Sequence, residues 1–352
     1  MRIIKVVTMA VLPGLLIAAS GIAQEVSDLG DGTWGTRELS HRISSGSGRQ
    51  IIIRSVDHLS GKIHIESGPV SEVTVNFQKM ARTRSRSRAI DYIDLISIAL
   101  ERLPQAVRLD FRAPNPPPWN TEREAGLIDA KVTVPLNATV EIEAVYFDVT
   151  VVGPLKSLYV PSSLGRFDVT DVTDHLGIST ANRRVNLARI GGSISVATSN
   201  SPITAENITC ESIPATFRNE SGDIKIDGFS GSINVKNQYG RINISDFHPQ
   251  GERNIIRSVA GPVTLDIATM ESGRLIVSCR HEDIDLTIPD TLQAFFSLAV
   301  DDDGSIQATG FPFTTDLVQR NRLSLVSGDG RAEISGSIRG QGNIYVNGIR
   351  GD

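Results

Sequence analysis

Four arginines alternate with other residues in the segment "ARTRSRSR". They are Arg82, Arg84, Arg86 and Arg88. In an extended segment, side chains two residues apart point to the same side, so we expect a stripe of positive charge on one face. Such a stripe can contact anionic polymers or lipid headgroups. The alternative is a charged strand edge that prevents aggregation between sheet edges.

Metal binding is the next chemistry that the residue types suggest. Asp301, Asp302 and Asp303 precede Gly304, but a calcium loop of the EF type has a glutamate at its twelfth position, and here Pro312 stands there. The six histidines have no metal-ligand spacing, and no H-E-x-x-H motif occurs. We therefore interpret the three aspartates as an acidic turn and predict no metal site and no cofactor.

The elements that position these residues follow from a repeat. Pairs of the form apolar-x-apolar return every nine residues, and a period of two within each pair is typical of a short strand with one face inward. The first members of the pairs are Val149, Leu158, Phe167, Leu176, Val185, Ile194 and Ile203. The register slips by three residues across "ENITCESIP" and resumes at Ala215. Beyond Ile244 the timing loosens, although short strands continue to Val346.

A second position defines the true length of the repeat. The fifth residue after each first member alternates between small and large from Ser163 onward, as in Val172, Ala181 and Ile190. The full unit then has about 18 residues, two strands and two unlike corners. Such a unit cannot bury its apolar face alone, and stacking buries a continuous core. We predict an all-β fold, a parallel β-solenoid (β-helix or β-roll) with an irregular N-terminal cap.

The residues before 140 do not follow this repeat. Gly61-x-Ile63-x-Ile65 is typical of a first coil or cap. The segment that follows the arginines can be a helix over 91–103, or a hairpin with Ile96, Ile98 and Leu100 opposite Val107, Leu109 and Phe111. We favour the hairpin, because Pro104 falls at the turn and alternation resumes after it. The predicted organisation is a signal peptide over 1–23, a cap with Arg-rich and Pro-rich insertions over 24–140, and the solenoid repeats over 141–352.

The predicted register shows which side chains point outward, and these can be examined for catalytic groups. Carbohydrate-active β-helix enzymes need carboxylates together with Arg or Lys on one sheet face. The outward positions are Thr150, Tyr159, Asp168, Gly177, Asn186, Ser195 and Thr204. They contain one acid and no basic partner in line, and nothing in the sequence resembles a nucleophile elbow. We predict no catalytic residues.

The N-terminus indicates export. Arg2 and Lys5 precede an apolar stretch that ends near Ile22, and small residues favour cleavage after Ala23. We expect a periplasmic or surface protein with no transmembrane segment after cleavage. A net charge of −5 argues against nucleic-acid binding.

Two cysteines in an exported protein raise the question of a disulfide. Cys210 and Cys279 are 69 residues apart, which corresponds to a separation on the order of 15 Å or more along the predicted stack. A disulfide needs Cα atoms within about 7 Å. We therefore predict two free thiols.

Several longer segments carry a resemblance to a known family. They are "GKIHIES", "VTVPLNATVEIEAVYFDVTVVG", the G-x-I-x-V units, "DIDLTIPDTLQAFFSLAVDDDGSI" and "GSIRGQGNIYVNGIRG". On these segments the chain resembles the bacterial putative-adhesin family of unknown function, the DUF4097-type β-strand repeat proteins, over most of residues 45–350. The resemblance implies an exported β-solenoid with an adhesive or envelope-associated role, and it supplies no catalytic residue.

These observations favour a non-enzymatic exported scaffold whose outer faces bind an envelope polymer or a protein. One alternative is a carbohydrate-active β-helix enzyme, a polysaccharide hydrolase or lyase. Another is an envelope-stress or assembly component that acts by binding a partner. A cluster of carboxylates with Arg or Lys on one face would favour the enzyme.

Overall fold

The computed structural model describes residues 25–45, 50–119, 123–301 and 303–350. Within these ranges the chain forms strands β1 to β27 and one helix, α1, so the predicted all-β class is confirmed. Among these residues, no helix has the length and apolar character needed to cross a membrane. The predicted signal peptide lies outside the described residues.

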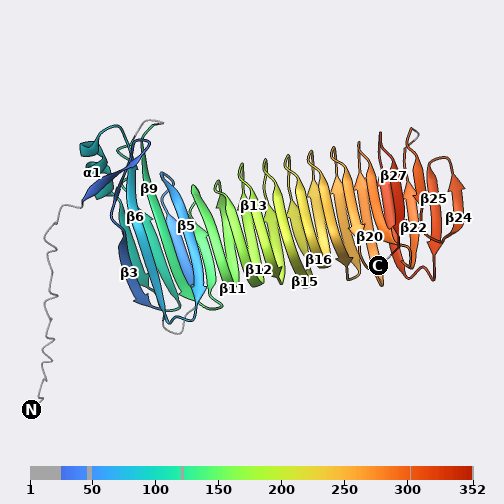
Figure 1. The fold of residues 1–352 in the computed structure, drawn as a ribbon, viewed down its shortest axis with the longest axis horizontal. Helices are drawn as coiled ribbons and strands as arrows, with labels where there is room; N and C mark the ends of the chain where they lie inside the picture. Colours follow the sequence, from blue (N-terminus) through green and yellow to red (C-terminus); the bar gives the residue numbers. More distant parts are fainter. Residues whose placement is uncertain (1–24, 46–49, 120–122, 302, 351–352) are drawn as a thin grey trace, which may run out of the picture.

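The central part of the chain is a stack of coils (Figure 1). Its strands are β10 (Thr139–Glu143), β11 (Phe147–Ser163), β12 (Phe167–Thr180), β13 (Val185–Gly191), β14 (Ser193–Ala197), β15 (Ile203–Arg218), β16 (Ile224–Asn237), β17 (Ile242–Pro249), β18 (Arg253–Ser258), β19 (Val263–Ile267), β20 (Gly273–Cys279) and β21 (Ile284–Pro289). Successive coils pair in parallel at an offset of 18 residues, as in Val149↔Phe167. Ile203 instead pairs with Ile224, so the predicted three-residue slip is confirmed.

The apolar pairs of the repeat form the core. Ile194 is 2% exposed and Ile233 is fully buried. The large corner residues are also buried, namely Val172, Ile190, Ile208, Phe229 and Phe247. Each follows a residue with positive φ, and these residues are Asp171, Arg189, Asn207, Gly228 and Asp246. The left-handed conformation turns the chain sharply from one layer into the other.

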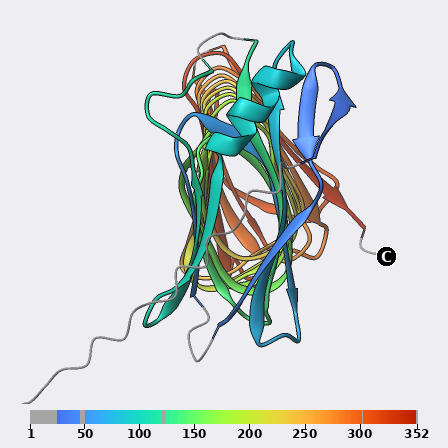
Figure 2. The ribbon, with the colours of Figure 1, turned by 90° about the vertical axis from the view of Figure 1, so that its left-hand side faces the viewer.

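Two facing layers result, as the view along the stack in Figure 2 shows. We call face A the outer surface of the layer whose core residues include Leu158, Ile194 and Val235. Face B is the outer surface of the layer whose core residues include Val149, Ile203 and Ile242. Long strands such as β11 and β12 bend at a corner and contribute to both layers.

The N-terminal end of the stack is not built in chain order. Its elements are β1 (Val26–Gly30), β2 (Thr33–Thr36), β3 (Leu39–Ser44), β4 (Gln50–Ser55), β5 (Leu59–Gly68), β6 (Glu72–Arg82), α1 (Arg86–Leu95), β7 (Ser97–Arg102), β8 (Ala106–Arg112) and β9 (Ala125–Pro135). Strand β4 pairs with both β8 and β10, and β5 pairs with both β9 and β11. The coil of residues 50–68 therefore lies between two coils that follow it in the chain.

The predicted hairpin around Pro104 is confirmed, and a helix that was not predicted precedes it. Strands β7 and β8 are antiparallel, with Leu100 opposite Leu109, and helix α1 precedes them. Ser85 caps the helix, because its Oγ accepts a hydrogen bond from the Arg88 backbone N–H at 3.3 Å. Ala89, Tyr92 and Ile93 are buried at helical spacing. The alternating arginines concealed this spacing.

The C-terminal end has the same kind of intercalation. Its strands are β22 (Ala294–Ala299), β23 (Ile306–Thr309), β24 (Thr314–Gln319), β25 (Arg322–Ser327), β26 (Ala332–Ile338) and β27 (Ile344–Ile349). Strand β26 lies between β20 and β22, and β27 lies between β21 and β23. The last coil of the chain is thus an inner coil of the stack. The hairpin of β24 and β25 occupies the end (Figure 1).

Both cysteines are free, as predicted, and both are buried. Cys279 is 3% exposed and Cys210 is 2% exposed, so both fill core positions. Burial raises the pKa of the Cys210 thiol, which disfavours the reactive thiolate.

Candidate functional site

A groove on face B, near the N-terminal end of the stack, is lined by both acidic and basic side chains. The hollow has a volume of about 340 Å³ and is formed over β5, β6 and β9. We call it the β5–β9 groove. Its lining residues are Glu38, Lys62, His64, Asn76, Phe77, Gln78, Asp129, Ala130 and Lys131.

Strand alternation places the charged groups in this groove. Ile63 and Ile65 point into the core and are at most 1% exposed, so Lys62, His64 and Glu66 point outward. The register with β9 brings Lys62 beside Asp129 and His64 beside Lys131.

Glu66 lies beside the groove and joins two of its lining residues, His64 and Lys131. Its Oε1 lies 2.7 Å from His64 Nε2 and 2.9 Å from Lys131 Nζ. The hydrogen bonds from Lys131 and His64 lower the pKa of Glu66, so this carboxylate stays ionised at neutral pH.

The pKa of Asp129 is shifted in the opposite direction, upward. Burial raises the pKa of Asp129, and the nearby Lys62 partly offsets this effect. One carboxyl is held ionised while a second one protonates more readily, and lysines stand beside both. This arrangement can bind an anionic or hydroxyl-rich ligand, and it has the groups needed for proton transfer.

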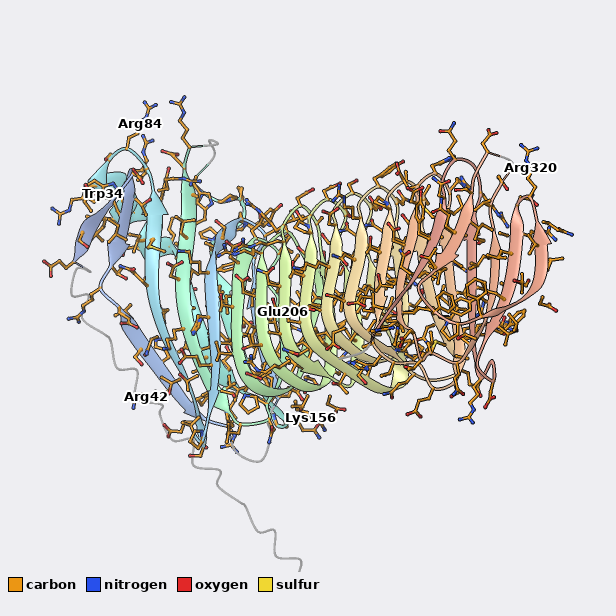
Figure 3. All side chains as sticks on the ribbon, turned by 45° about the vertical axis from the view of Figure 1, so that its right-hand side comes forward. Trp34, Arg42, Arg84, Lys156, Glu206 and Arg320 are labelled. Carbon is orange, nitrogen blue, oxygen red and sulfur yellow. The ribbon has the colours of Figure 1, made fainter. Side chains whose placement is uncertain are left out.

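Asp168, the one acid among the predicted outward positions, lies outside the β5–β9 groove and has other partners. Asp168 accepts a hydrogen bond from Asn186 Nδ2 at 2.6 Å and pairs with Arg166 Nε at 3.2 Å. A shallow groove of about 280 Å³ runs over this part of face B and reaches Glu206. Figure 3 shows Glu206 near the middle of the stack. The basic partner of Asp168, Arg166, lies two residues before it in the chain. It is therefore not one of the outward positions that the sequence prediction compared.

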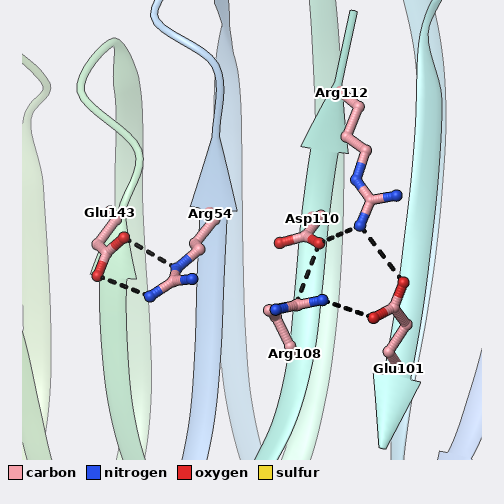
Figure 4. A network of polar contacts seen from close by, with 6 residues as sticks. All are labelled: Arg54, Glu101, Arg108, Asp110, Arg112 and Glu143. Carbon is pink, nitrogen blue, oxygen red and sulfur yellow. Dashed lines mark hydrogen bonds and ion pairs between the residues drawn. The ribbon is translucent and has the colours of Figure 1, made fainter.

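A set of ion pairs lies on face A at the N-terminal end (Figure 4). Arg54 Nε is 2.9 Å from Glu143, and Arg108 Nη2 is 2.6 Å from Glu101. Asp110 pairs with both Arg108 and Arg112. Since these groups neutralise one another across neighbouring strands, we interpret the set as stabilising the sheet end.

The predicted arginine stripe is wrong in its geometry. Arg82 ends β6, Arg84 lies in the turn, and Arg86 and Arg88 belong to the first turn of α1. A helix spreads residues two apart over different faces, so the four side chains do not share one side. All four are exposed, and Figure 3 shows Arg84 pointing away from the end of the stack.

Arg88 has a structural partner that the sequence did not indicate. Its Nη1 lies 2.8 Å from Glu124 Oε1, and Tyr92 donates a hydrogen bond to Glu124 Oε2 at 3.0 Å. The hydrogen bond from Arg88 lowers the pKa of Glu124. These contacts fasten the segment before β9 to α1.

The acidic turn has one clear contact. Asp301 Oδ2 accepts a hydrogen bond from the Gly340 backbone N–H at 2.7 Å. In the described part of the chain, no three His, Cys, Asp or Glu side chains gather as a metal site would require. Asp302 lies outside that part.

A larger cavity arises from the intercalated last coil. It has a volume of about 670 Å³ and lies where the chain crosses over β26 on its way from β21 to β22. Met270 and Leu292 are buried in its wall, and Glu271 and Arg331 stand at its rim.

The stacked parallel strands and their polar outer faces define an all-β strand-repeat protein. Residues 131–299 match the family profile of the Toastrack DUF4097 domain, and the chain carries a domain of this family there. The predicted family resemblance is thereby confirmed, over a shorter stretch than residues 45–350.

Solved structures of low sequence identity are similar to the chain. A putative cell adhesion protein from Clostridium sporogenes has 11% identity and a TM-score of 0.22, with 89% of this chain and 99% of that chain covered. A putative adhesin from Bacteroides fragilis has 11% identity and a TM-score of 0.31, with coverages of 88% and 97%. A putative adhesin from Parabacteroides merdae has 8% identity and a TM-score of 0.36, with coverages of 88% and 95%. No curated protein matches the chain.

The sequence contained a signal for the β5–β9 groove that the prediction did not use. Lys62, His64 and Glu66 alternate with buried isoleucines, and Asp129 and Lys131 do the same in β9. What the alternation cannot indicate is that β9 lies beside β5.

Proposed function

We propose that the chain is an exported β-solenoid scaffold without catalytic activity, adhesin-like or envelope-associated. In this proposal its outer faces bind a polymer or a protein of the cell envelope. The observation that carries the proposal is the in-register alignment of polar side chains along both faces. Such columns offer repeated hydrogen-bonding groups to an extended ligand.

These columns run across several strands. On face A, Ser195, Thr216 and Asn234 occupy equivalent positions of successive coils. On face B, Thr150 and Asn186 flank Asp168, and Thr204 follows Asn186. The flat surface suits a long partner better than a small molecule enclosed in a pocket.

A pull-down tests the proposal. Residues 24–352 are incubated with insoluble peptidoglycan, cell-wall polysaccharides and whole-envelope extract. Each pelleted polysaccharide is then assayed for new reducing ends and unsaturated sugars. We expect binding without cleavage. Binding to none of these materials, or cleavage of a bound polymer, would contradict the proposal.

The β5–β9 groove favours one second candidate, a carbohydrate-active enzyme. Asp129 and Glu66, whose pKa values move in opposite directions, stand among lysines on one face. If any polysaccharide is cleaved, Asp129→Asn and Glu66→Gln should each lower the rate by at least about 100-fold. Asp227→Asn, farther along face B, is the matched control and should leave the rate unchanged. Equal rates in all three variants would exclude the groove as the reaction site.

A further inference from the structure

Three positively charged side chains lie side by side on face A. Arg218 of β15 is in register with Lys236 of β16, and Lys236 is in register with Arg257 of β18. All three side chains are exposed. We call them the cation ladder. With neighbouring strands about 4.8 Å apart, the ladder presents three charges over a span of roughly 10 Å.

Several other cations of the stack have an ion-pair partner. Arg54 pairs with Glu143, Arg166 with Asp168, and Arg274 with Glu333. Across the described ranges, by contrast, the ion pairs include none of the three ladder residues. Like charges directly opposite one another destabilise a sheet. An external anion would remove this repulsion.

The surroundings of the ladder indicate which kind of anion fits. Thr216 and Asn234 form the adjacent column on the same strands, so hydrogen-bonding groups stand beside the charges. Tyr239 follows at the corner and is 64% exposed. An exposed tyrosine offers a flat apolar ring and a hydroxyl group, the combination on which sugar rings stack.

Face B of the same coils carries two neighbouring acids, and Lys225 of β16 lies beside them. Glu206 is in register with Asp227, and both side chains are exposed. Electrostatic complementarity therefore directs a negatively charged partner to face A and away from face B.

We propose that the cation ladder binds a polysaccharide with closely spaced carboxylates, which lies across the strands of face A. The inference rests on the proposed scaffold function and adds the class of polymer and its place. Carboxylates pair with the guanidinium and ammonium groups of the ladder, while Tyr239, Thr216 and Asn234 contact the sugar rings.

The test compares two triple variants of residues 24–352. The ladder variant carries Arg218→Ser, Lys236→Ser and Arg257→Ser. The control carries Arg184→Ser, Lys225→Ser and Arg241→Ser, which removes the same charge from exposed positions outside the ladder. Binding of labelled polygalacturonate is measured at low and high salt. Neutral dextran and vesicles containing phosphatidylglycerol are measured in parallel.

We expect wild-type protein to bind polygalacturonate, more weakly at high salt, and not dextran. Each exposed ion pair contributes a factor of about three, so the ladder variant should bind roughly 30-fold more weakly. The control should stay within about threefold of wild type.

Several results would overturn the inference. They are absence of polygalacturonate binding by wild type, equal losses in the two variants, and ladder-dependent binding to vesicles alone. Ladder-dependent self-association without polymer would also overturn it, because face B of a second copy would then be the partner. If the envelope pull-down succeeds while the ladder variant binds normally, the scaffold function stands and the ladder assignment fails.

Discussion

Lys79 Nζ lies 3.2 Å from the carbonyl oxygen of Ile93, at the C-terminal end of α1. The same ammonium group donates to the Ile96 carbonyl, also at 3.2 Å. Lys79 is 8% exposed, so a buried cation donates to the Ile96 carbonyl and also to the Ile93 carbonyl, which accepts a further hydrogen bond from the Ile96 backbone N–H. This contact attaches α1 to β6 and completes the N-terminal end of the stack.

The titration of Lys79 should appear in the stability of the protein. Burial lowers the pKa of Lys79 below its usual 10.5, with Asp94 opposing. Between the folded and unfolded pKa values the unfolded chain binds more protons, so the free energy of unfolding rises with pH in that window. Below the folded pKa both states are protonated, and this dependence is absent. Urea unfolding between pH 8 and 10.5 should show the rise in wild type, and Lys79→Met should flatten it. Parallel curves for the two proteins would contradict the assignment.

Acid should release α1 from the segment that precedes β9. Since Arg88 lowers the pKa of Glu124 from its usual 4.5, the contribution of this contact is fully present above pH 4.5 and is lost as pH falls through the lower, folded pKa. Trp119 reports on the segment, because its Nε1 donates to the His58 carbonyl at 3.1 Å and its ring contacts Tyr92. In a Trp34→Phe background, fluorescence should change below pH 4.5, and Glu124→Gln should remove this transition. The same transition in both proteins would assign it to another group.

Adjacent core and surface positions should respond very differently to the same charge. Ile233 is fully buried, whereas the neighbouring Asn234 points outward on face A. Ile233→Asp should cost more than about 4 kcal/mol, since a carboxylate without a partner enters an apolar core. Asn234→Asp should change stability by less than about 0.5 kcal/mol. Denaturant unfolding measures both, and similar values would contradict the register.

Removal of the last coil should damage more than the deleted residues. Ala332, Ile334, Ile338, Ile344 and Val346 are at most 2% exposed, and burial of each large side chain contributes about 1.5–3 kcal/mol. A chain ending at Gly330 loses these contacts, and β22 and β23 lose their only link to β20 and β21 among the described pairings. We expect hydrogen exchange protection to vanish over residues 294–330. Val318→Ser, at a side chain 72% exposed in β24, is the control and should leave protection unchanged. Retained protection after truncation would refute the intercalated order.

Both thiols should react only after unfolding. Cys210 and Cys279 are buried, and burial raises the pKa of Cys210. The reagent 5,5′-dithiobis(2-nitrobenzoate) should therefore detect no thiol in the native protein within minutes, and two per chain in denaturant. Failure to detect two thiols in denaturant would mean that a disulfide had formed.

The sequence predicted the regular coils because their signal is local and repeated. The pairs from Val149 to Ile244, the corners at Val172 and Phe229, and the slip near Cys210 all follow from spacing alone. The ends were not predictable in this way. Ile344-x-Val346 has the same pattern as every other strand, and nothing local determines that it lies between Ile284 and Ile306.

The same reason explains the missed parts of the candidate site. Glu66 meets Lys131, and Arg88 meets Glu124, because segments far apart in the chain become neighbours. A pattern within one strand shows which side chains point outward and not which strand lies beside them.

The position of the coil of residues 50–68 also affects the order of assembly. This coil is made early and is flanked by β8–β9 on one side and by β10–β11 on the other. Growth of the stack can therefore proceed from it in two directions. The opposite end does not grow in chain order, because β22 and β25 pair with each other and, among the described pairings, join the stack only through β26 and β27, which are made later. Until β26 and β27 are made, the outer edges of β20 and β21 stay unpaired, and aggregation competes with folding during that time.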